Sequence, residues 1–170
     1  GFEADKLMNE SSDSLLKVEN ELYEDTNVSR SLGIALRTIN SLDRVLVIYG
    51  DLVFDKNALE ILDYKNSSIF ALNNFMGEEE VGCIINQNGK LEHMMYDLPY
   101  KWSQIAYFEG KELDYLKEIT WNRNNNRLFG FEVINKIIEK GGQFKCEYSE
   151  EIKIIDVDTS KDIQKARNII

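Results

Sequence analysis

A run of five apolar residues, Val45–Tyr49, stands out in the hydrophobic pattern and stops at Gly50 and Asp51. Because the run is rich in β-branched residues and has no polar alternation, it predicts a strand buried on both faces, as in the centre of a parallel sheet. Ligands bind beyond the carboxyl ends of such strands. Asp51 is therefore either a functional acid or a cap for the next turn. Gly50 would let a backbone or a ligand approach closely.

Apolar residues at helical spacing predict helices around this strand. One helix is expected to begin at Ser29 or Ser31 and to end near Leu42, and Asp55 can cap the next one. Further helices are predicted over residues 3–9, 113–119, 128–140 (with Phe129 turned inward) and from Thr159 onward, where Asp162 completes a capping box.

Shorter apolar runs predict the remaining strands. Asn88-Gly89, between apolar runs, is a strong hairpin signal. Strands that alternate with helices indicate an α/β domain, with a mixed, mostly parallel central sheet flanked by helices and carrying an inserted β-hairpin. A length of 170 residues suits a single domain over residues 1–170. The predicted strands cover residues 15–19, 68–72, 81–85, 91–95, 103–108, 144–147 and 152–155.

Charge and composition narrow the function classes. The formal net charge is −10, from 30 acidic and 20 basic residues, and the basic residues form no stripe, which disfavours nucleic acid or an anionic membrane as partner. No apolar run approaches the roughly 18 residues of a membrane span. Cys83 and Cys146 lie far apart without metal-site spacing, which favours buried thiols in a cytoplasmic protein.

Two acidic turns follow predicted strands: Gly50-Asp51, and Asp156-Val157-Asp158. Mg²⁺ prefers oxygen ligands and commonly takes one or two carboxylates, with water and substrate phosphates completing its shell. Two strand-end carboxylates from separate strands would suit that ion. Asp158 could also merely precede a helix cap, and Asp156-Val157-Asp158 formally matches the Asp-x-Asp of glycosyltransferases. The acidic run Glu78–Glu80 is interpreted as a solvated turn.

Several stretches resemble the nucleotidyltransferases that join a nucleoside triphosphate to a sugar phosphate or to phosphocholine. YGDLVFDKNALEIL (49–62) followed by IDVDTSKDIQKA (155–166) carries the most specific part of the resemblance. Three more segments resemble the phosphocholine cytidylyltransferase-like branch: NELYEDTNVSRSLGIAL (20–36), KWSQIAYFEGKELDYL (101–116) and FGFEVINKIIEKGG (129–142).

The resemblance implies the nucleotide-diphospho-sugar transferase fold and a Mg²⁺-dependent transfer of a nucleotidyl group, CMP being favoured, with release of pyrophosphate. It implies that Asp51 and Asp158 are the catalytic Mg²⁺ ligands, with Asp156 as a rival for the second position. It places Asn27, Ser29, Ser31 and Gly50 near the nucleotide. Three residues are candidates for the acceptor side. Glu132 matches a Glu of the resembling segment, Lys101 could meet the acceptor phosphate, and Trp102 with Tyr100 and Tyr107 could cage a quaternary ammonium by cation–π contact. As alternatives, these aromatic residues are core, and Lys101 and Glu132 are solvated.

One departure qualifies these expectations. The family begins with a strand and a basic, Gly-rich phosphate loop, whereas this sequence starts where the family's second strand ends. We therefore expect the chain to represent the C-terminal two-thirds of such a domain, to turn over nucleotide poorly or not at all by itself, and to leave a sheet edge open for a homo-oligomer or a partner chain. A glycosyltransferase and a non-catalytic nucleotide-binding or regulatory domain remain as alternatives.

Overall fold

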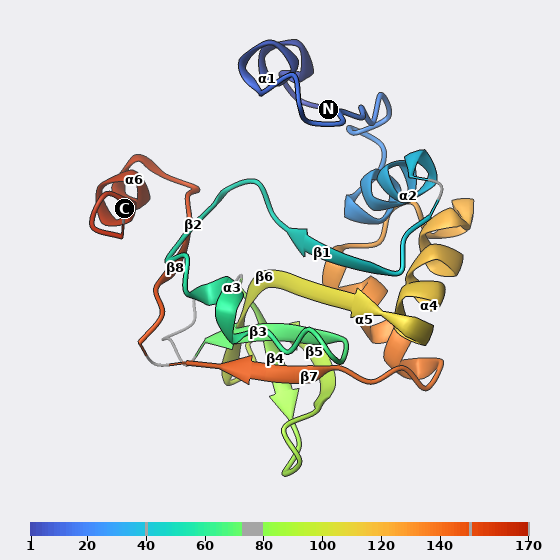
Figure 1. Ribbon diagram of the computed structural model, residues 1–170, viewed down its shortest axis with the longest axis vertical. Helices are drawn as coiled ribbons and strands as arrows, with labels where there is room; N and C mark the ends of the chain where they lie inside the picture. Colours follow the sequence, from blue (N-terminus) through green and yellow to red (C-terminus); the bar gives the residue numbers. More distant parts are fainter. Residues whose placement is uncertain (40, 73–79, 150, 170) are drawn as a thin grey trace.

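The computed structural model describes residues 1–39, 41–72, 80–149 and 151–169. They form an α/β fold with a mixed central sheet flanked by helices, which confirms the predicted class (Figure 1). The strand order is β5-β4-β6-β3-β7, with β1 beside β6. The bounds are β1 Arg44–Ile48, β3 Ser68–Leu72, β4 Val81–Ile85, β5 Leu91–Tyr96, β6 Tyr100–Glu109 and β7 Lys145–Tyr148.

The prediction of a mostly parallel sheet is wrong. Among the described strands only β3 and β7 pair in parallel, and the other pairings are antiparallel. Parallel neighbours need a long crossover, and α4 (Gly110–Trp121) and α5 (Gly130–Glu139) lie in the chain between β3 and β7. The chain from β3 to β6 instead passes through the β4–β5 hairpin, so β6 enters between β1 and β3 in the opposite direction. The hairpin itself is confirmed, with Gly89 at a φ of 73° in its turn.

β1 is not a central strand, in contrast to the prediction. It pairs with β6 on one side, and no other described strand pairs with it. Its central residues are only half-buried, and Arg44 and Ile48 are exposed. The run is apolar because its side chains alternate between the two faces of the sheet, and both faces are covered. Val45 and Val47 pack against one core cluster and Leu46 against the other.

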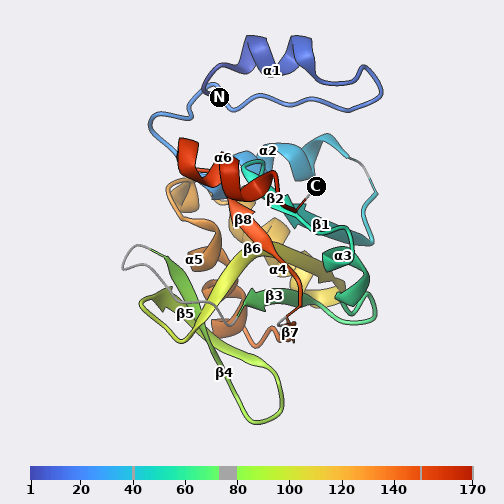
Figure 2. The ribbon, with the colours of Figure 1, turned by 90° about the vertical axis from the view of Figure 1, so that its left-hand side faces the viewer.

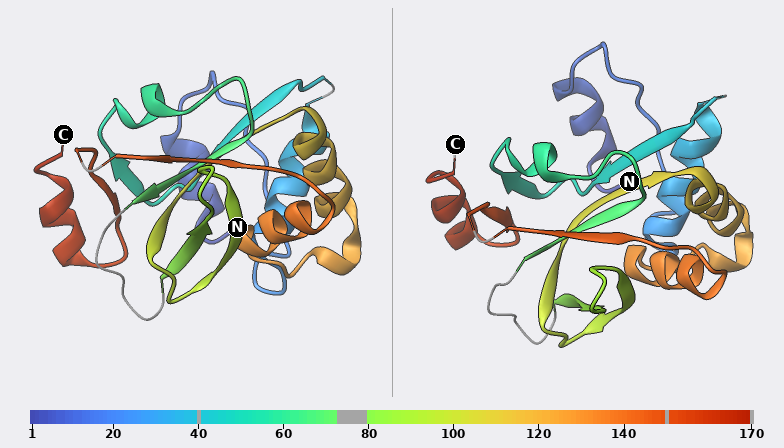
Figure 3. Two further views of the ribbon diagram at one scale, coloured as in Figure 1. Left: turned by 90° about the horizontal axis from the view of Figure 1, so that it is seen from below. Right: turned by 60° about the horizontal axis from the view of Figure 1, so that its bottom comes forward.

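The two core clusters lie on opposite faces of the sheet. The larger one packs α2 (Val28–Thr38), α4 and α5 against the sheet, around Leu36, Leu116 and Ile137. The smaller one lies under α3 (Ala58–Ile61), around Phe70 and Ile105. Figure 3 shows α2, α4 and α5 gathered on one side, with α6 (Ser160–Ala166) on the opposite side. β3, whose five residues are all buried, forms the sheet's interior.

Chain ends and caps differ in part from the prediction. Residues 15–19 form no strand, because a strand needs a hydrogen-bonded neighbour and no described segment pairs with them. Asn27, rather than Ser29 or Ser31, caps α2, with its Oδ1 accepting a hydrogen bond from Val28 N at 2.8 Å. α2 also ends earlier than predicted, at Thr38. α1 (Ala4–Glu10) has no buried residue and lies apart from the sheet (Figure 2).

A small second sheet joins distant parts of the chain. β2 (Leu52–Phe54) pairs antiparallel with β8 (Ile154–Asp156), so that Leu52 lies opposite Asp156. The short 3₁₀ helix Arg123–Asn125 links α4 to α5. Cys83 and Cys146 are free thiols; Cys83 is buried, as predicted, whereas Cys146 is only partly buried. No helix among the described residues is long and apolar enough to cross a membrane.

Candidate functional site

The site begins with a gap beside β6. β1 ends opposite Ile105, whereas the pairing of β4 with β6 starts with Gly82 opposite Lys101, so residues 102–104 have no described strand partner on that side. The two strands meet β6 on the same edge, one after the other, and leave this short stretch of its edge uncovered. The side chains of Trp102 and Gln104 line the resulting hollow.

β6 also bulges at this point. Its pairing with β3 shifts register between Ile69 and Ala71, and Gln104 has a φ of 62°. Side chains replace part of the interrupted ladder: Ser103 Oγ donates a hydrogen bond to the Phe70 carbonyl at 2.8 Å. Bulges re-aim side chains and are frequent next to active sites.

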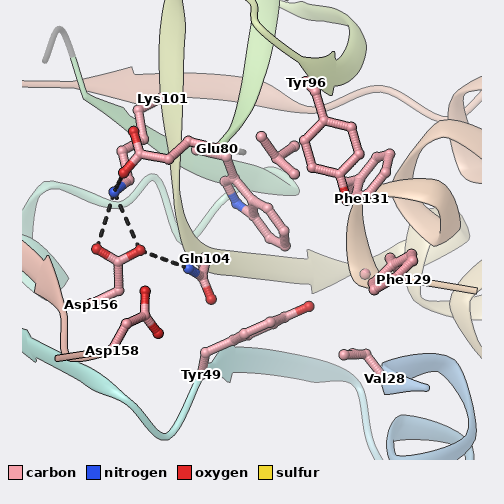
Figure 4. Close-up of a pocket in the computed structure, with 13 residues that line it drawn as sticks. Val28, Tyr49, Glu80, Tyr96, Lys101, Gln104, Phe129, Phe131, Asp156 and Asp158 are labelled. Carbon is pink, nitrogen blue, oxygen red and sulfur yellow. Dashed lines mark hydrogen bonds and ion pairs between the residues drawn. The ribbon is translucent and has the colours of Figure 1, made fainter. Parts of the chain in front are cut away.

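The hollow is a cavity of about 300 Å³ with an aromatic end and a charged end (Figure 4). In the aromatic part, Tyr49 and Trp102 are edge-to-face with ring centroids 5.6 Å apart, and Tyr96 and Phe131 are edge-to-face at 5.4 Å. Phe129 stacks on Phe131. The charged end holds three carboxylates and one ammonium, from Glu80, Asp156, Asp158 and Lys101. An aromatic pocket with excess negative charge suits a cationic group.

Tyr49 and α5 close the aromatic end. A Cβ added at Gly130 would overlap the Tyr49 hydroxyl and come within 3.3 Å of Trp102. A backbone hydrogen bond from Gly130 reaches this hydroxyl, yet burial, with the nearby Asp51 charge, raises the pKa of Tyr49 to about 12. Tyr49 is therefore a neutral phenol at any physiological pH.

The two acidic turns lie side by side. Val157 N donates a hydrogen bond to the Asp51 carbonyl at 2.9 Å, next to the β2–β8 pair. The pKa of Asp158 is raised by partial burial and by the negative charges of Asp156 and Asp51, with Lys101 opposing. The carboxylates of Asp51 and Asp158 therefore share one electrostatic environment, although they lie far apart in the sequence.

Asp156 and Asp158 are in different situations. Both oxygens of Asp156 accept hydrogen bonds from Lys101 Nζ, at 3.0 and 3.2 Å, and Gln104 Nε2 lies 3.4 Å from Oδ2. Asp158 makes no hydrogen bond or ion pair with the part of the chain that the structure describes. Asp158 therefore has its oxygens free, whereas Asp156 is tied to the cavity wall.

Residues 1–39, 41–72, 80–149 and 151–169 contain no cluster of three or more His, Cys, Asp or Glu side chains arranged to hold a metal ion. Mg²⁺ does not need such a cluster, because it usually takes one or two carboxylates and keeps water and phosphate oxygens as its other ligands. The Asp51 and Asp158 carboxylates fit that requirement in number and in chemistry.

Lys101 is buried between two acids. Burial would lower its pKa, but the hydrogen bonds and charges of Glu80 and Asp156 outweigh burial and raise it. Lys101 is therefore a protonated lysine whose charge is already matched, unlike the solvated or phosphate-binding lysine that the sequence suggested. Glu80, assigned to a solvated turn, is its second partner in the cavity; Glu78 and Glu79 lie outside the described residues.

The four candidate nucleotide-binding residues, Asn27, Ser29, Ser31 and Gly50, do not line a common cavity. Asn27 and Ser31 line a second, open hollow of about 440 Å³ beside Tyr49. Ser29 is fully buried, and its Oγ has no hydrogen-bond partner among the described residues. Gly50 is exposed, and a Cβ added to it would meet nothing within 4 Å.

The structure gives Tyr100, Tyr107 and Glu132 positions that differ from the acceptor-binding roles expected of them. Tyr100 and Tyr107 do not line the cavity with Trp102; Tyr107 instead donates a hydrogen bond to Glu109 and packs edge-to-face on Tyr64. Glu132 accepts a hydrogen bond from Phe129 N at 2.8 Å, which stabilises the start of α5, and it is not among the residues that line the cavity.

Sequence reasoning missed several cavity residues. Tyr49 and Phe129 were assigned to the core, but Phe129 is 47% exposed at the cavity. Tyr96, Gln104 and Phe131 received no role. Aromatic residues clustered near Pro99 and near Gly130 were the available signal, but strand and helix periodicity alone does not show which elements meet.

No protein-family model matches the sequence, and no curated protein is detectably similar to it in sequence. Solved structures do share the fold. The inositol-1-phosphate CTP transferase of T. maritima superposes with a TM-score of 0.76 at 14% identity, covering 97% of this chain and 70% of that one. The CTP:phosphocholine cytidylyltransferase of Streptococcus pneumoniae gives a TM-score of 0.70 at 19% identity, covering 97% of this chain and 72% of that one.

A third solved structure extends the comparison to a different acceptor. A putative glucose-1-phosphate thymidylyltransferase from Bacillus anthracis gives a TM-score of 0.66 at 18% identity, covering 90% of this chain and 63% of that one. The chain therefore has the fold of these nucleotidyltransferase structures.

Proposed function

We propose that this chain is the acceptor-binding and metal-binding part of a nucleotidyltransferase that acts on a small phosphorylated acceptor with a positively charged end. The observation that carries this proposal is the position of Asp158, which belongs both to the pair of acidic turns and to the aromatic cavity. A phosphate bound near Asp158 would therefore lie between a metal site and a pocket for the rest of the acceptor.

In the proposed reaction, an oxygen of the acceptor phosphate attacks the α-phosphorus of a nucleoside triphosphate. The new P–O bond forms as the bond to the β-phosphate bridging oxygen breaks, and pyrophosphate leaves with that electron pair. Asp51 and Asp158 would hold Mg²⁺, which supplies charge neutralisation for the phosphates when bound. The contribution of the protein is alignment of the two substrates.

The residues that line the cavity support the proposal that the acceptor has a positively charged end. Trp102, Tyr49 and Tyr96 offer π-faces, and the carboxylates of Asp156 and Glu80 add negative charge beyond what Lys101 neutralises. Phosphocholine has the matching chemistry, with a quaternary ammonium at one end and a phosphate at the other. CTP is the donor favoured by the sequence resemblance.

A glycosyltransferase that used Asp156-Val157-Asp158 as a metal-binding pair is less well supported. Such a pair needs both carboxylates, and Lys101 already binds both oxygens of Asp156.

Calorimetric titration of the chain tests the proposal. With Mg²⁺ present, we expect CTP to bind more tightly than UTP or a nucleotide-sugar, and phosphocholine to bind the cavity. Asp158→Asn should abolish the Mg²⁺-dependent part of nucleotide binding, whereas Asp114→Asn, which removes an exposed acid on α4, should not. A preference for the nucleotide-sugar would favour the glycosyltransferase, and absence of all binding would favour a non-catalytic role.

A further inference from the structure

Gln104 has a backbone conformation that its side chain does not favour. Glu3, Asp97 and Gln104 are the described non-glycine residues with positive φ, and of these Gln104 alone lines the cavity. The left-handed region brings Cβ too close to the following carbonyl, so it is common only for Gly, Asn and Asp. Glycine would adopt the observed φ of 62° without that clash. The reason for a glutamine at this position must therefore lie in its side chain.

The side chain of Gln104 points at Asp156. Its Nε2 lies 3.4 Å from Asp156 Oδ2, on the side of the carboxylate that faces the cavity (Figure 4). The gap between β1 and β4 leaves room for the side chain, and the bulge in β6 aims it. Strained conformations persist where the surroundings fix them, and they cluster at functional sites.

A neutral amide differs from Lys101 in what it does to Asp156. Lys101 both orients the carboxylate and cancels charge, whereas Gln104 orients it and leaves its charge in place. With Glu80 also on Lys101, the cavity wall keeps a net negative charge held in a fixed position. A fixed negative charge beside π-faces discriminates between a phosphorylated acceptor whose other end is cationic and one whose other end is uncharged.

We propose that Gln104 is a positioning residue that holds Asp156 in the cavity wall and so makes the site selective for phosphorylated acceptors with a cationic end over sugar phosphates, whose sugar end carries no charge. Asp158 is then left for the metal. This inference rests on the proposed function, because it assigns the acceptor specificity of the same site.

The test compares affinities of the complete chain for phosphocholine and for glucose 1-phosphate by calorimetry. The wild type is expected to prefer phosphocholine. Gln104→Gly removes the amide and relieves the backbone, so the preference should fall roughly tenfold, as for loss of a hydrogen bond to a charged group, while the thermal unfolding midpoint rises by about 2–4 °C. Gln104→Asn tolerates the left-handed backbone but is one methylene too short to reach Asp156, so it should lose the preference too.

Asp97→Gly is the matched control. Asp97 has a φ of 61° in an exposed turn and does not line the cavity. Its substitution should raise the unfolding midpoint without changing the ratio of the two affinities. A Gln104→Gly chain that keeps the wild-type ratio overturns the inference and leaves the proposed function standing. A wild type that binds neither acceptor overturns the proposed function, and the inference falls with it.

Discussion

Among single residues, Gly130 controls the shape of the cavity because it has no side chain, which leaves room for the Tyr49 hydroxyl. Because a Cβ there would overlap the Tyr49 hydroxyl, Gly130→Ala should displace Tyr49 or the start of α5. Overpacking of this kind destabilises by about 1–3 kcal/mol. Urea denaturation measures the change. The control is Gly50→Ala, since a Cβ at Gly50 meets nothing within 4 Å and should change stability by no more than about 0.5 kcal/mol. Equal effects of the two substitutions would contradict this account of the cavity.

Asp156 and Asp158 should respond in opposite directions to removal of charge. Local desolvation and neighbouring carboxylates raise the pKa of Asp158, so Asp158→Asn relieves repulsion. Because Asp158 is exposed and solvent screens its charge, the substitution should stabilise the fold only slightly, within the about 0.5 kcal/mol typical of surface changes. Asp156→Asn removes a partner of the buried Lys101 ammonium and should destabilise by roughly 1 kcal/mol. Thermal unfolding at neutral pH, without added metal, measures both. A destabilised Asp158→Asn chain would mean that Asp158 has a structural partner.

The sequence could identify the acids but not the residues around them. Asp51 and Asp158 each follow an apolar run, and such a local pattern is visible in the linear sequence. Glu80, Gln104 and Tyr49 reach the same place only because β1 and β4 meet β6 end to end. That juxtaposition depends on the order of strands in the sheet, which periodicity does not encode.

Among the secondary-structure elements, the N-terminal cap of α6 should stabilise the fold in a pH-dependent way, which can be tested. Asp162 Oδ2 accepts hydrogen bonds from Thr159 N and Oγ1, at 3.1 and 2.6 Å, which confirms the predicted capping box. With the Lys165 ammonium, these bonds lower the pKa of Asp162 to about 2. Since the pKa of an unfolded Asp is about 3.9, the stabilisation is complete above about pH 4 and is lost as the pH falls towards 2.

Asp162→Asn should therefore lower the urea midpoint at pH 6 and have little effect near pH 2. Thr159→Ser keeps a hydroxyl at the cap and serves as the control, with little change at either pH. A deficit in Asp162→Asn that stays constant across this pH range would show that the ionised carboxylate is not what stabilises the cap.

The contrast between caps and strand pairings explains which elements sequence reasoning predicted correctly. The α6 cap and the β4–β5 hairpin depend on a few neighbouring residues, and both are confirmed. The strand expected at 15–19 and the mostly parallel sheet depend on partners elsewhere in the chain, and both predictions failed. The helix cap at Asn27 was missed because Ser29, an equally good capping residue by type, follows closely and is buried instead.

Over the whole molecule, two features remain uncovered: apolar side chains near the N-terminus and one edge of β1. Phe2, Leu7 and Leu16 are 75%, 65% and 67% exposed, and α1 buries no residue. β1, whose residue Ile48 is 37% exposed, has no partner among the described strands on the side away from β6, and so offers an open edge there. An open strand edge that carries an exposed apolar residue is a site of association.

We therefore predict that the chain associates with a second copy through the β1 edge in a concentration-dependent manner. The net charge of −10 opposes this contact, so association should strengthen when salt screens the repulsion. Sedimentation velocity over a range of concentrations, at low and high salt, measures this association.

Ile48→Lys places a charge at the open edge and should shift the chain to monomer, as charged edge residues do in natural sheets. Ile84→Lys is the control, because Ile84 is similarly exposed, at 40%, but belongs to β4, which has neighbours on both sides. A wild type that stays monomeric at every concentration, or an equal effect of both lysines, would show that the β1 edge is not the contact.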